Sequence, residues 1–383
     1  MRSIAVVGIG QTKIGEHWGS SLRDLARESG KLALQDSDIE NKPEALFVGN
    51  MSAGRFAGQE HLGALVADTL SLKVPATRVE GACASGALAF RKACLSIASG
   101  KYDVAMALGV EKMTDLKTDE VVSSLMAAGD QEQEASVGLS FSGVFALIAN
   151  LYMNRYNLSR EELALIPVKN HKNGVNNPHA QFNFEVTVDD VLKSPLIADP
   201  LRLLDCSPIS DGSAAVILAS EEIAKRSKNP VWVLASEQAN DTIALHNRED
   251  ICTLNSVVRA AREAYKQSGL GPRDIGFVEA HDCFSIAELI AYEDLGFSEK
   301  GKGKELLLNK EVEITGSIPF NPSGGLKVGH PVGATGIKQI VEAVKQLRGV
   351  GTNQVSRAKT GLTQNIGGSG ATAVVSIFSN EMR

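Results

Sequence analysis

One stretch of this sequence decides the fold: Val79-Glu80-Gly81-Ala82-Cys83-Ala84-Ser85-Gly86-Ala87. It joins an extended segment, 76–80, to a helical pattern at 87–93. A cysteine at such a junction lies near a helix N-terminus, where free N–H groups and the helix dipole favour a thiolate over a thiol. The small neighbouring residues leave room for a substrate at the sulfur. The stretch therefore predicts a nucleophilic cysteine on a strand–turn–helix unit of an α/β protein.

Three further stretches place reactive or glycine-rich groups where strands end or helices begin. The first is Glu279-Ala280-His281-Asp282-Cys283-Phe284, after an apolar run at 275–278 that predicts a buried strand. The second is Gly329-His330-Pro331-Val332-Gly333-Ala334-Thr335-Gly336, before a helical pattern at 340–347. The third is Thr363-Gln364-Asn365-Ile366-Gly367-Gly368-Ser369-Gly370, before a strand at 371–378. A lone histidine in such a loop is more often a turn or core residue, but α/β folds gather reactive groups at these junctions, so the four stretches together predict one site.

These four stretches, in this order, resemble the thiolase family. The resemblance is closest to the branch with an HDCF motif, which includes sterol-carrier-protein-type thiolases and archaeal acetoacetyl-CoA thiolases. It implies that Cys83 is the acyl-accepting cysteine, that His281 begins the HDCF motif, and that His330 is the histidine of the GHPxGxxG motif. It also implies that the backbone N–H of Gly367 helps to form an oxyanion hole.

The chain departs from the family pattern at one catalytic position. Most thiolases carry a second cysteine in a CxG motif where this chain has Asn365. The HDCF branch supplies its second cysteine from the HDCF motif, so the resemblance implies that Cys283 replaces it as the catalytic base. The alternative for Cys283 is a core residue beside Phe284.

An internal repeat supports the architecture that the resemblance implies. Segment 4–10 has a counterpart at 231–235, and the turn at Cys83 matches the turn at His330. We expect an α/β thiolase fold, with two homologous βαβαβαββ-type halves in an αβαβα layered sandwich. The expected units are an N-terminal half (1–111 with 205–225), an inserted CoA-binding loop domain (112–204) and a C-terminal half (226–383).

The inserted segment is where the resemblance places coenzyme A. Ser207, His171 and Lys172 are the residues expected to contact it, although a lysine there could equally lie on a solvated helix face. His171 and His179 are eight residues apart, which matches no common metal motif. We therefore expect no metal and no permanently bound cofactor, with coenzyme A as substrate and product.

Composition excludes several other classes of protein. A net charge of −6 argues against nucleic-acid binding, which needs a basic surface. Five cysteines without a C-x-x-C pair argue against a disulfide framework or a zinc site. The chain shows no apolar run of membrane-spanning length and starts directly with a strand pattern, so we expect a cytoplasmic protein without membrane association.

The expected function is that of an acetyl-CoA C-acetyltransferase, which condenses two acetyl-CoA molecules to acetoacetyl-CoA, and cleaves it in reverse, through acyl-Cys83. The alternatives are a longer-chain 3-ketoacyl-CoA thiolase, or a non-catalytic protein of this fold that binds acyl-CoA or acts as a scaffold. Decarboxylating condensing enzymes, with one cysteine, and synthases with a glutamate base, for which Glu80 or Glu279 would have to serve, fit less well.

The archaeal branch also implies partners and a pathway. It implies a homodimer or homotetramer and a supply of acetoacetyl-CoA to mevalonate and isoprenoid synthesis. It further implies a complex with hydroxymethylglutaryl-CoA synthase, bridged by a small zinc-ribbon and OB-fold protein.

Overall fold

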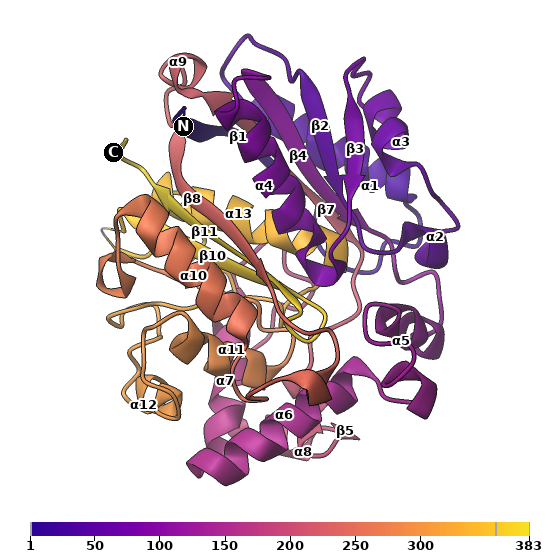
Figure 1. Ribbon diagram of the computed structural model, residues 1–383, viewed down its shortest axis with the longest axis vertical. Coiled ribbons are helices and arrows are strands. Elements are labelled where there is room, and N and C mark those ends of the chain that lie inside the picture. The colour runs from indigo at the N-terminus through magenta and orange to yellow at the C-terminus, as the bar shows by residue number, and fades with distance from the viewer. Residues whose placement is uncertain (1, 357, 383) are drawn as a thin grey trace.

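The computed structural model describes residues 2–356 and 358–382, and within them nine strands form one mixed sheet (Figure 1). In spatial order the strands are β3 (Ala76–Val79), β2 (Ala45–Gly49), β4 (Val104–Glu111), β7 (Gly212–Ser220), β1 (Ile4–Gln11), β8 (Val231–Asn240), β11 (Thr372–Ser379), β10 (Thr360–Gly367) and β9 (Val278–Glu279).

The strand order reads the same way from the centre to either edge. The central strands β1 and β8 pair antiparallel, from Ile4 opposite Val233 to Val6 opposite Val231. Outward from them, β7, β4 and β2 in the first half correspond to β11, β10 and β9 in the second. Phe320 makes a parallel bridge to Val278 in the place that corresponds to β3. The two predicted homologous halves are thus confirmed.

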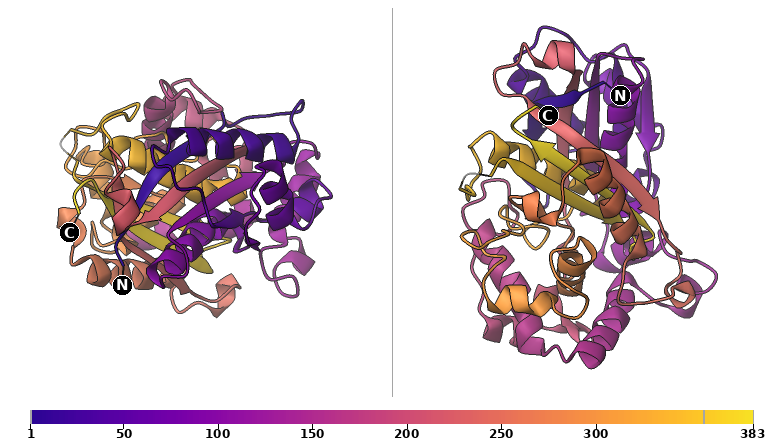
Figure 2. Two further views of the ribbon diagram at one scale, coloured as in Figure 1. Left: turned by 90° about the horizontal axis from the view of Figure 1, so that it is seen from above. Right: turned by 60° about the vertical axis from the view of Figure 1, so that its left-hand side comes forward.

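Helices complete the expected five layers, in which the two halves of the sheet form the two β layers. Helices α1 (Leu22–Asp36) and α3 (Leu62–Thr69) cover the outer face of the first half, and α10 (Asn255–Ser268) covers that of the second. Between the halves lie α4 (Ser85–Ala98) and α13 (Thr335–Leu347), packed against each other and against strands of the sheet. Figure 2 shows the two halves from two further directions. All of α13 except Lys345 is buried, as a helix enclosed on both sides must be.

Glycines allow α4 and α13 to approach closely at their N-termini. A Cβ atom on Gly86 would lie 2.8 Å from the carbonyl oxygen of Gly333. A Cβ atom on Gly336 would lie 2.3 Å from the backbone nitrogen of Ala87. Neither position accepts a side chain, so the two helix starts meet backbone to backbone.

The segment 112–204 lies at the lower end of the molecule in Figure 1. It contains α5 (Thr118–Met126), α6 (Phe141–Tyr156), α7 (Arg160–Gly174) and α8 (Val188–Lys193), followed by the short hairpin of β5 (Leu196–Ala198) and β6 (Leu201–Arg202). Helix α7 begins with a capping box at Ser159, and it packs on α11 (Ser285–Asp294) and α12 (Gly303–Leu308). Two short helices, α2 (Ala53–Phe56) and α9 (Glu221–Ala224), complete the set. In the described part of the chain, no helix combines the length and the apolar character needed to cross a bilayer.

Two expectations from the sequence were wrong in detail. The apolar run at 275–278 was expected to form a strand, but only Val278 and Glu279 do so, because a 3-10 turn precedes them. The repeat also has a different register at the two turns. Helix α4 follows a 3-10 turn at Ala82–Ala84, and α13 follows one at Val332–Ala334, so Cys83 corresponds to Gly333 rather than to His330.

Candidate active site

The turn before α4 presents Cys83 on a constrained backbone. Ala82 has a φ of 53°, which side-chain-bearing residues rarely adopt. Its N–H donates to Oε1 of Glu80 (2.6 Å), and its carbonyl oxygen accepts from Oγ of Ser85 (2.6 Å). The same Ser85 oxygen accepts from the N–H of Gly81 (3.0 Å). These bonds fix the backbone on both sides of the cysteine.

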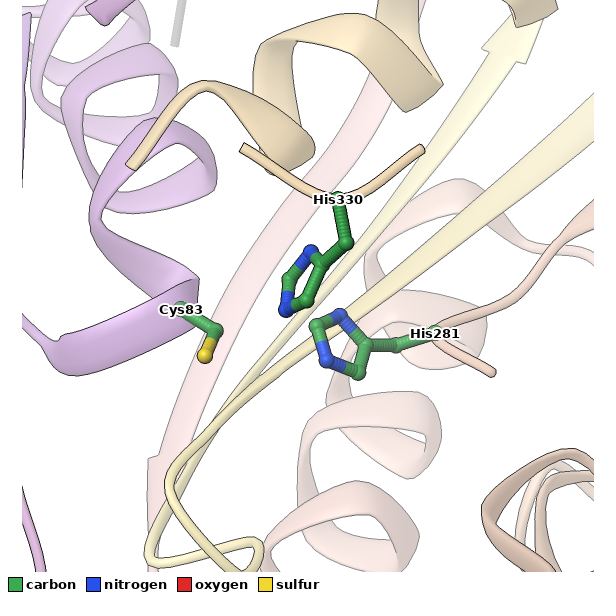
Figure 3. A group of neighbouring side chains, drawn as sticks. All are labelled: Cys83, His281 and His330. Carbon is green, nitrogen blue, oxygen red and sulfur yellow. The ribbon is translucent and has the colours of Figure 1, made fainter. Parts of the chain in front are cut away.

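Three reactive side chains from distant parts of the sequence converge here. One ligand-type atom each from Cys83, His281 and His330 lies within 4.8 Å of the other two (Figure 3). The two imidazole rings are 5.0 Å apart and almost perpendicular, at 86°. His281 lies on the loop after β9, and His330 on the loop before α13. The structure therefore brings together the three side chains that the sequence singled out as one site.

Buried polar groups hold the loop that carries His330. Its N–H donates to Oγ of Ser210 (2.9 Å), and its Nδ1 lies 2.7 Å from Oγ1 of Thr335. The ammonium group of Lys338 donates to the carbonyl oxygens of Gly325 (2.7 Å) and Gly329 (3.1 Å). Because Lys338 belongs to α13, the position of the loop is tied to that of the helix.

His281 is held from the neighbouring strand β10. Its N–H donates to Oε1 of Gln364 (2.8 Å), and its Nδ1 lies 2.8 Å from Nδ2 of Asn365. Sequence reasoning identified Asn365 only as the residue that replaces a cysteine, not as a partner of His281. The signal that could have found the contact is that both residues depart from the usual thiolase motifs together.

Cys283 is buried, with 6% of its surface exposed, and lies close enough to Cys83 for charge on that sulfur to raise the pKa of Cys283. Its carbonyl oxygen accepts from the N–H of Ser207 (2.8 Å), so Ser207 also lies beside the HDCF segment.

Gly367 packs on the turn that carries Cys83, where a Cβ atom would lie 2.3 Å from the carbonyl oxygen of Gly81. A cavity of about 360 Å³ opens beside this turn and is lined in part by Glu80, Gly81, Ala82 and Gly367.

The electrostatics of Cys83 differ from the expectation based on the helix N-terminus. Burial raises the pKa of its thiol to about 12; the N–H of Gly368 opposes this in part, and the nearby carboxyl groups of Glu111 and Glu80 raise the pKa further by smaller amounts. The expected thiolate was therefore wrong for the resting state. Desolvation outweighs the helix dipole because Cys83 packs in an apolar cluster with residues distant in the chain, such as Met51, Met113 and Val332, which a local sequence pattern does not reveal.

Both histidines are held neutral. Burial lowers the pKa of His281 to about 3 and that of His330 well below its usual value. The cations of Lys327 and Lys338 lower both further, because a second positive charge nearby is unfavourable. Burial also raises the pKa of the Cys283 thiol far above its usual value. At neutral pH the site thus holds two neutral thiols and two neutral imidazoles.

Glu111 is a buried residue of the site region that sequence reasoning missed. Its carboxylate accepts from the N–H groups of Met51 (2.8 Å), Ser52 (3.2 Å) and Gly333 (3.0 Å), and from Nδ2 of Asn50 (2.8 Å). Burial raises its pKa to about 7. Because Gly333 belongs to the turn before α13, this one carboxylate makes hydrogen bonds to both halves of the molecule.

Two residues predicted to contact coenzyme A, His171 and Lys172, lie in the last turn of α7. His171 is buried, stacks on Phe184 at 5.0 Å, and has a pKa lowered to about 4 by burial. Lys172 is largely exposed, lies 3.6 Å from a carboxylate oxygen of Glu313, and lines a cavity of about 590 Å³ between α7 and α12. The residues that line this cavity include none of Cys83, His281, Cys283 and His330.

Comparison with known proteins extends these observations. The thiolase N-terminal domain profile matches residues 4–222, and a profile described as thiolase C-terminal domain-like matches residues 237–380. An acetyl-CoA acetyltransferase of Methanothermobacter thermautotrophicus is 52% identical over 99% of this chain and all of that protein. Human sterol carrier protein 2 is 36% identical over 98% of this chain and 71% of that protein.

Solved structures are similar over the same length. A structure described as an Ltp2-ChsH2(DUF35) aldolase superposes with a TM-score of 0.85 at 25% identity, covering 99% of this chain and 98% of that one. The fold described above is therefore shared with a solved structure over nearly the full chain.

Proposed function

This chain belongs to the thiolase family, and we propose that it condenses two acetyl-CoA molecules to acetoacetyl-CoA, and cleaves acetoacetyl-CoA in reverse, through an acyl group on Cys83. The observation that carries the proposal is the convergence of Cys83, His281 and His330 within 4.8 Å, with Cys283 beside them. The 52% identity to an archaeal acetyl-CoA acetyltransferase supports the choice of substrate.

The first half of the reaction transfers an acetyl group to the enzyme. His330 takes the proton of the Cys83 thiol, and the sulfur attacks the thioester carbon of acetyl-CoA. The N–H groups of Cys83 and Gly367 stabilise the oxyanion that forms. The bond from carbon to the sulfur of coenzyme A breaks, and Cys283 donates its proton to that leaving sulfur. Because the pKa of Cys283 is raised, it is a thiol at rest and is able to donate.

The second half forms the carbon–carbon bond. The Cys283 thiolate produced in the first half removes a proton from the α-carbon of a second acetyl-CoA, and His281 and His330 stabilise the negative charge on the enolate oxygen. The carbanion attacks the acetyl carbon on Cys83. The Cys83 sulfur leaves and takes the proton back from His330, so both thiols and both imidazoles return to their resting state.

Coenzyme A and other proteins bind this chain as part of the same proposed function. Coenzyme A is substrate and product, and Ser207 contacts its pantetheine arm, since the Ser207 backbone bonds to Cys283. Free cysteines suit a reducing cytoplasm.

The chain forms a homodimer or homotetramer and supplies acetoacetyl-CoA for isoprenoid synthesis. It does so in complex with hydroxymethylglutaryl-CoA synthase and a bridging zinc-ribbon protein; the structural relative whose name joins Ltp2 with ChsH2(DUF35) supports a second component.

The test is coenzyme A-dependent cleavage of acetoacetyl-CoA, followed by the absorbance of its Mg²⁺-enolate. We expect turnover by the wild type and losses of about 10²–10⁴-fold for both Cys83→Ala and Cys283→Ala, since each removes a group that moves a proton or bonds to the substrate. Cys94→Ala is the matched control, because Cys94 is a buried cysteine of α4 in the core between the two halves, and it should retain activity.

Each contrary result has a distinct meaning. Turnover of longer 3-ketoacyl-CoA substrates in preference to acetoacetyl-CoA would replace the proposed substrate with a longer acyl chain. An inactive wild type that still binds acyl-CoA would indicate a binding or scaffold protein. Activity that survives in Cys283→Ala would remove Cys283 from the mechanism and leave it as a core residue.

A further inference from the structure

We propose, on the basis of the function proposed above, that His281 and His330 are held in opposite neutral tautomers. His281 carries its proton on Nε2 and His330 on Nδ1, and Asn365 is the positioning residue that sets the tautomer of His281. One ring is thereby a hydrogen-bond donor toward the substrate, and the other is a base toward Cys83.

The tautomer of His330 follows from its proposed role as the base for Cys83, together with Thr335. Oγ1 of Thr335 lies 2.9 Å from the carbonyl oxygen of Pro331 and 2.7 Å from Nδ1 of His330. The Pro331 oxygen also accepts the N–H groups of Ala334 and Thr335 (both 2.9 Å), so it is the role as base that assigns the ring proton. A base toward Cys83 needs an unprotonated Nε2, so Nδ1 carries the proton and donates to the hydroxyl oxygen of Thr335. The other ring nitrogen, Nε2, is left with a lone pair.

The tautomer of His281 follows from the amide of Asn365. Nδ2 of Asn365 lies 2.8 Å from Nδ1 of His281, and an amide nitrogen can only donate. Nδ1 of His281 is therefore the acceptor, and the ring proton belongs to Nε2. The two rings are therefore opposite tautomers, although both are hydrogen-bonded through Nδ1.

The surroundings favour this orientation of the Asn365 amide. Its Oδ1 lies beside Gly336, since a Cβ atom on that glycine would be 2.4 Å from the oxygen. Gly336 is in the first turn of α13, where the positive end of the helix dipole favours an oxygen over an NH₂ group. In this orientation one buried atom, Oδ1, has no hydrogen-bond partner among the described residues, whereas the reversed amide would direct two N–H groups toward the helix start without an acceptor.

The arrangement leaves one donor ready for the substrate. In Figure 3 the ring nitrogens remote from the backbone, the Nε2 atoms, both face the sulfur of Cys83. Among the described residues, Nε2 of His281 has no hydrogen-bond partner although His281 is 99% buried. A buried, unpaired N–H beside the nucleophile is a preformed donor for a thioester or enolate oxygen. With its proton on Nε2, His281 also offers no lone pair there, so the Cys83–His281–His330 cluster is not a ready metal site.

The departure from the family pattern then has a physical reason. Asn365 stands at the position of the CxG cysteine, and His281 stands where other thiolases have the asparagine of an NEAF motif. An asparagine side chain donates through its NH₂ group without any partner, whereas a neutral histidine donates from Nε2 only when something keeps Nδ1 free of hydrogen. His281 and Asn365 therefore work as a matched pair.

The first experiment reads the tautomers directly. The full chain is labelled with ¹⁵N-histidine, and long-range ¹H–¹⁵N correlation spectra at pH 7.5 are assigned by the loss of signals in His281→Asn and His330→Asn. We expect a protonated Nε2 and an unprotonated Nδ1 for His281, and the reverse for His330. The same tautomer in both rings would overturn the proposal, whether or not the chain proves to be a thiolase.

The second experiment connects the tautomer to turnover. Asn365→Leu keeps the side-chain volume and removes the donor, and we expect kcat to fall about 10²-fold, as for loss of one oxyanion donor, with a smaller change in KM. In a His281→Asn background, which supplies an amide N–H without a tautomer, the same change should cost less than about 3-fold. Thr363→Val, a buried change two residues earlier on β10, is the control and should leave kcat unchanged.

An equal loss from Asn365→Leu in both backgrounds would overturn the positioning role, because it would indicate a packing effect that does not pass through His281. If Asn365→Leu does not fold, the spectra of the wild type still decide the tautomers. If no acyl-CoA is turned over but the tautomers are opposite, the proposed function fails and the assignment of the two rings stands.

Discussion

The hydroxyl oxygen of Thr335 lies 2.7 Å from Nδ1 of His330, and both residues are buried. Thr335 is the first residue of α13, five positions after the histidine in the chain. The start of the helix therefore orients the ring that faces Cys83. Removal of this hydroxyl tests whether the orientation matters for proton transfer.

Thr335→Val should lower kcat by about 10- to 100-fold, because Nδ1 loses its acceptor and the ring is free to place its proton on either nitrogen. Thr335→Ser keeps the hydroxyl and should stay within a few-fold of the wild type. Initial rates of acetoacetyl-CoA cleavage give the comparison. Equal rates for the valine and serine variants would mean that His330 is oriented by its loop alone.

Cys83 should react slowly with iodoacetamide at neutral pH. Its pKa of about 12 leaves a very small thiolate fraction, which rises about tenfold for each pH unit as long as the pH stays well below the pKa. We therefore expect the alkylation rate to keep rising from pH 7 to pH 9, measured by mass spectrometry of the peptide that contains Cys83. A rate that levels off below pH 8 would show that the resting sulfur is already a thiolate.

Cys283 should be essential for proton removal from the acceptor, whereas acetyl transfer to Cys83 should continue more slowly without it, because the sulfur of coenzyme A is able to leave as a thiolate. Cys283→Ala should still form acetyl-Cys83 from acetyl-CoA, detected by the mass of the intact protein. The same variant should lose exchange of the α-protons of acetyl-CoA with D₂O by about 10²-fold or more. Exchange at the wild-type rate would assign the base to another group.

Glu111 should stabilise the fold across the two halves. Glu111→Ala leaves three backbone N–H groups without their acceptor and should lower the free energy of unfolding by about 3 kcal/mol. Glu111→Gln should cost less, about 2 kcal/mol, because its amide oxygen keeps two of the four hydrogen bonds while its NH₂ group faces the other two N–H donors. Urea unfolding of the two variants measures the difference, and equal losses would contradict the role of the acceptor oxygens.

The sequence predicted those elements whose signal is local. Helix α13 was visible from its apolar spacing, and the turn at Cys83 from its small residues between a strand and a helix. The repeat predicted two halves, and the structure adds that they share one sheet through β1 and β8. These features depend on neighbours within about ten residues, or on a comparison of the chain with itself.

The remaining features depend on contacts that no local pattern carries. Asn365 and His281 are 84 positions apart, and they meet because β10 and β9 are parallel neighbours. The pKa of Cys83 is raised mainly by burial among residues distant in the chain, so a rule for helix N-termini gave the wrong direction. Glu111 ends a strand and resembles any surface carboxylate in the sequence until Gly333 is placed against it.

The central pairing of β1 with β8 has an evolutionary consequence. The two halves contribute equivalent strands, β1 and β8, to this central pairing. A single ancestral half could therefore have paired with a second copy of itself along the same sheet edge. Such an ancestor would have carried two equivalent sites related by its symmetry axis. Fusion of two such copies would free each to diverge; in the present chain the second site has Gly333 in the place of the nucleophile and Glu80 in the place of the base. The present enzyme is asymmetric in chemistry on a backbone that is still nearly symmetric.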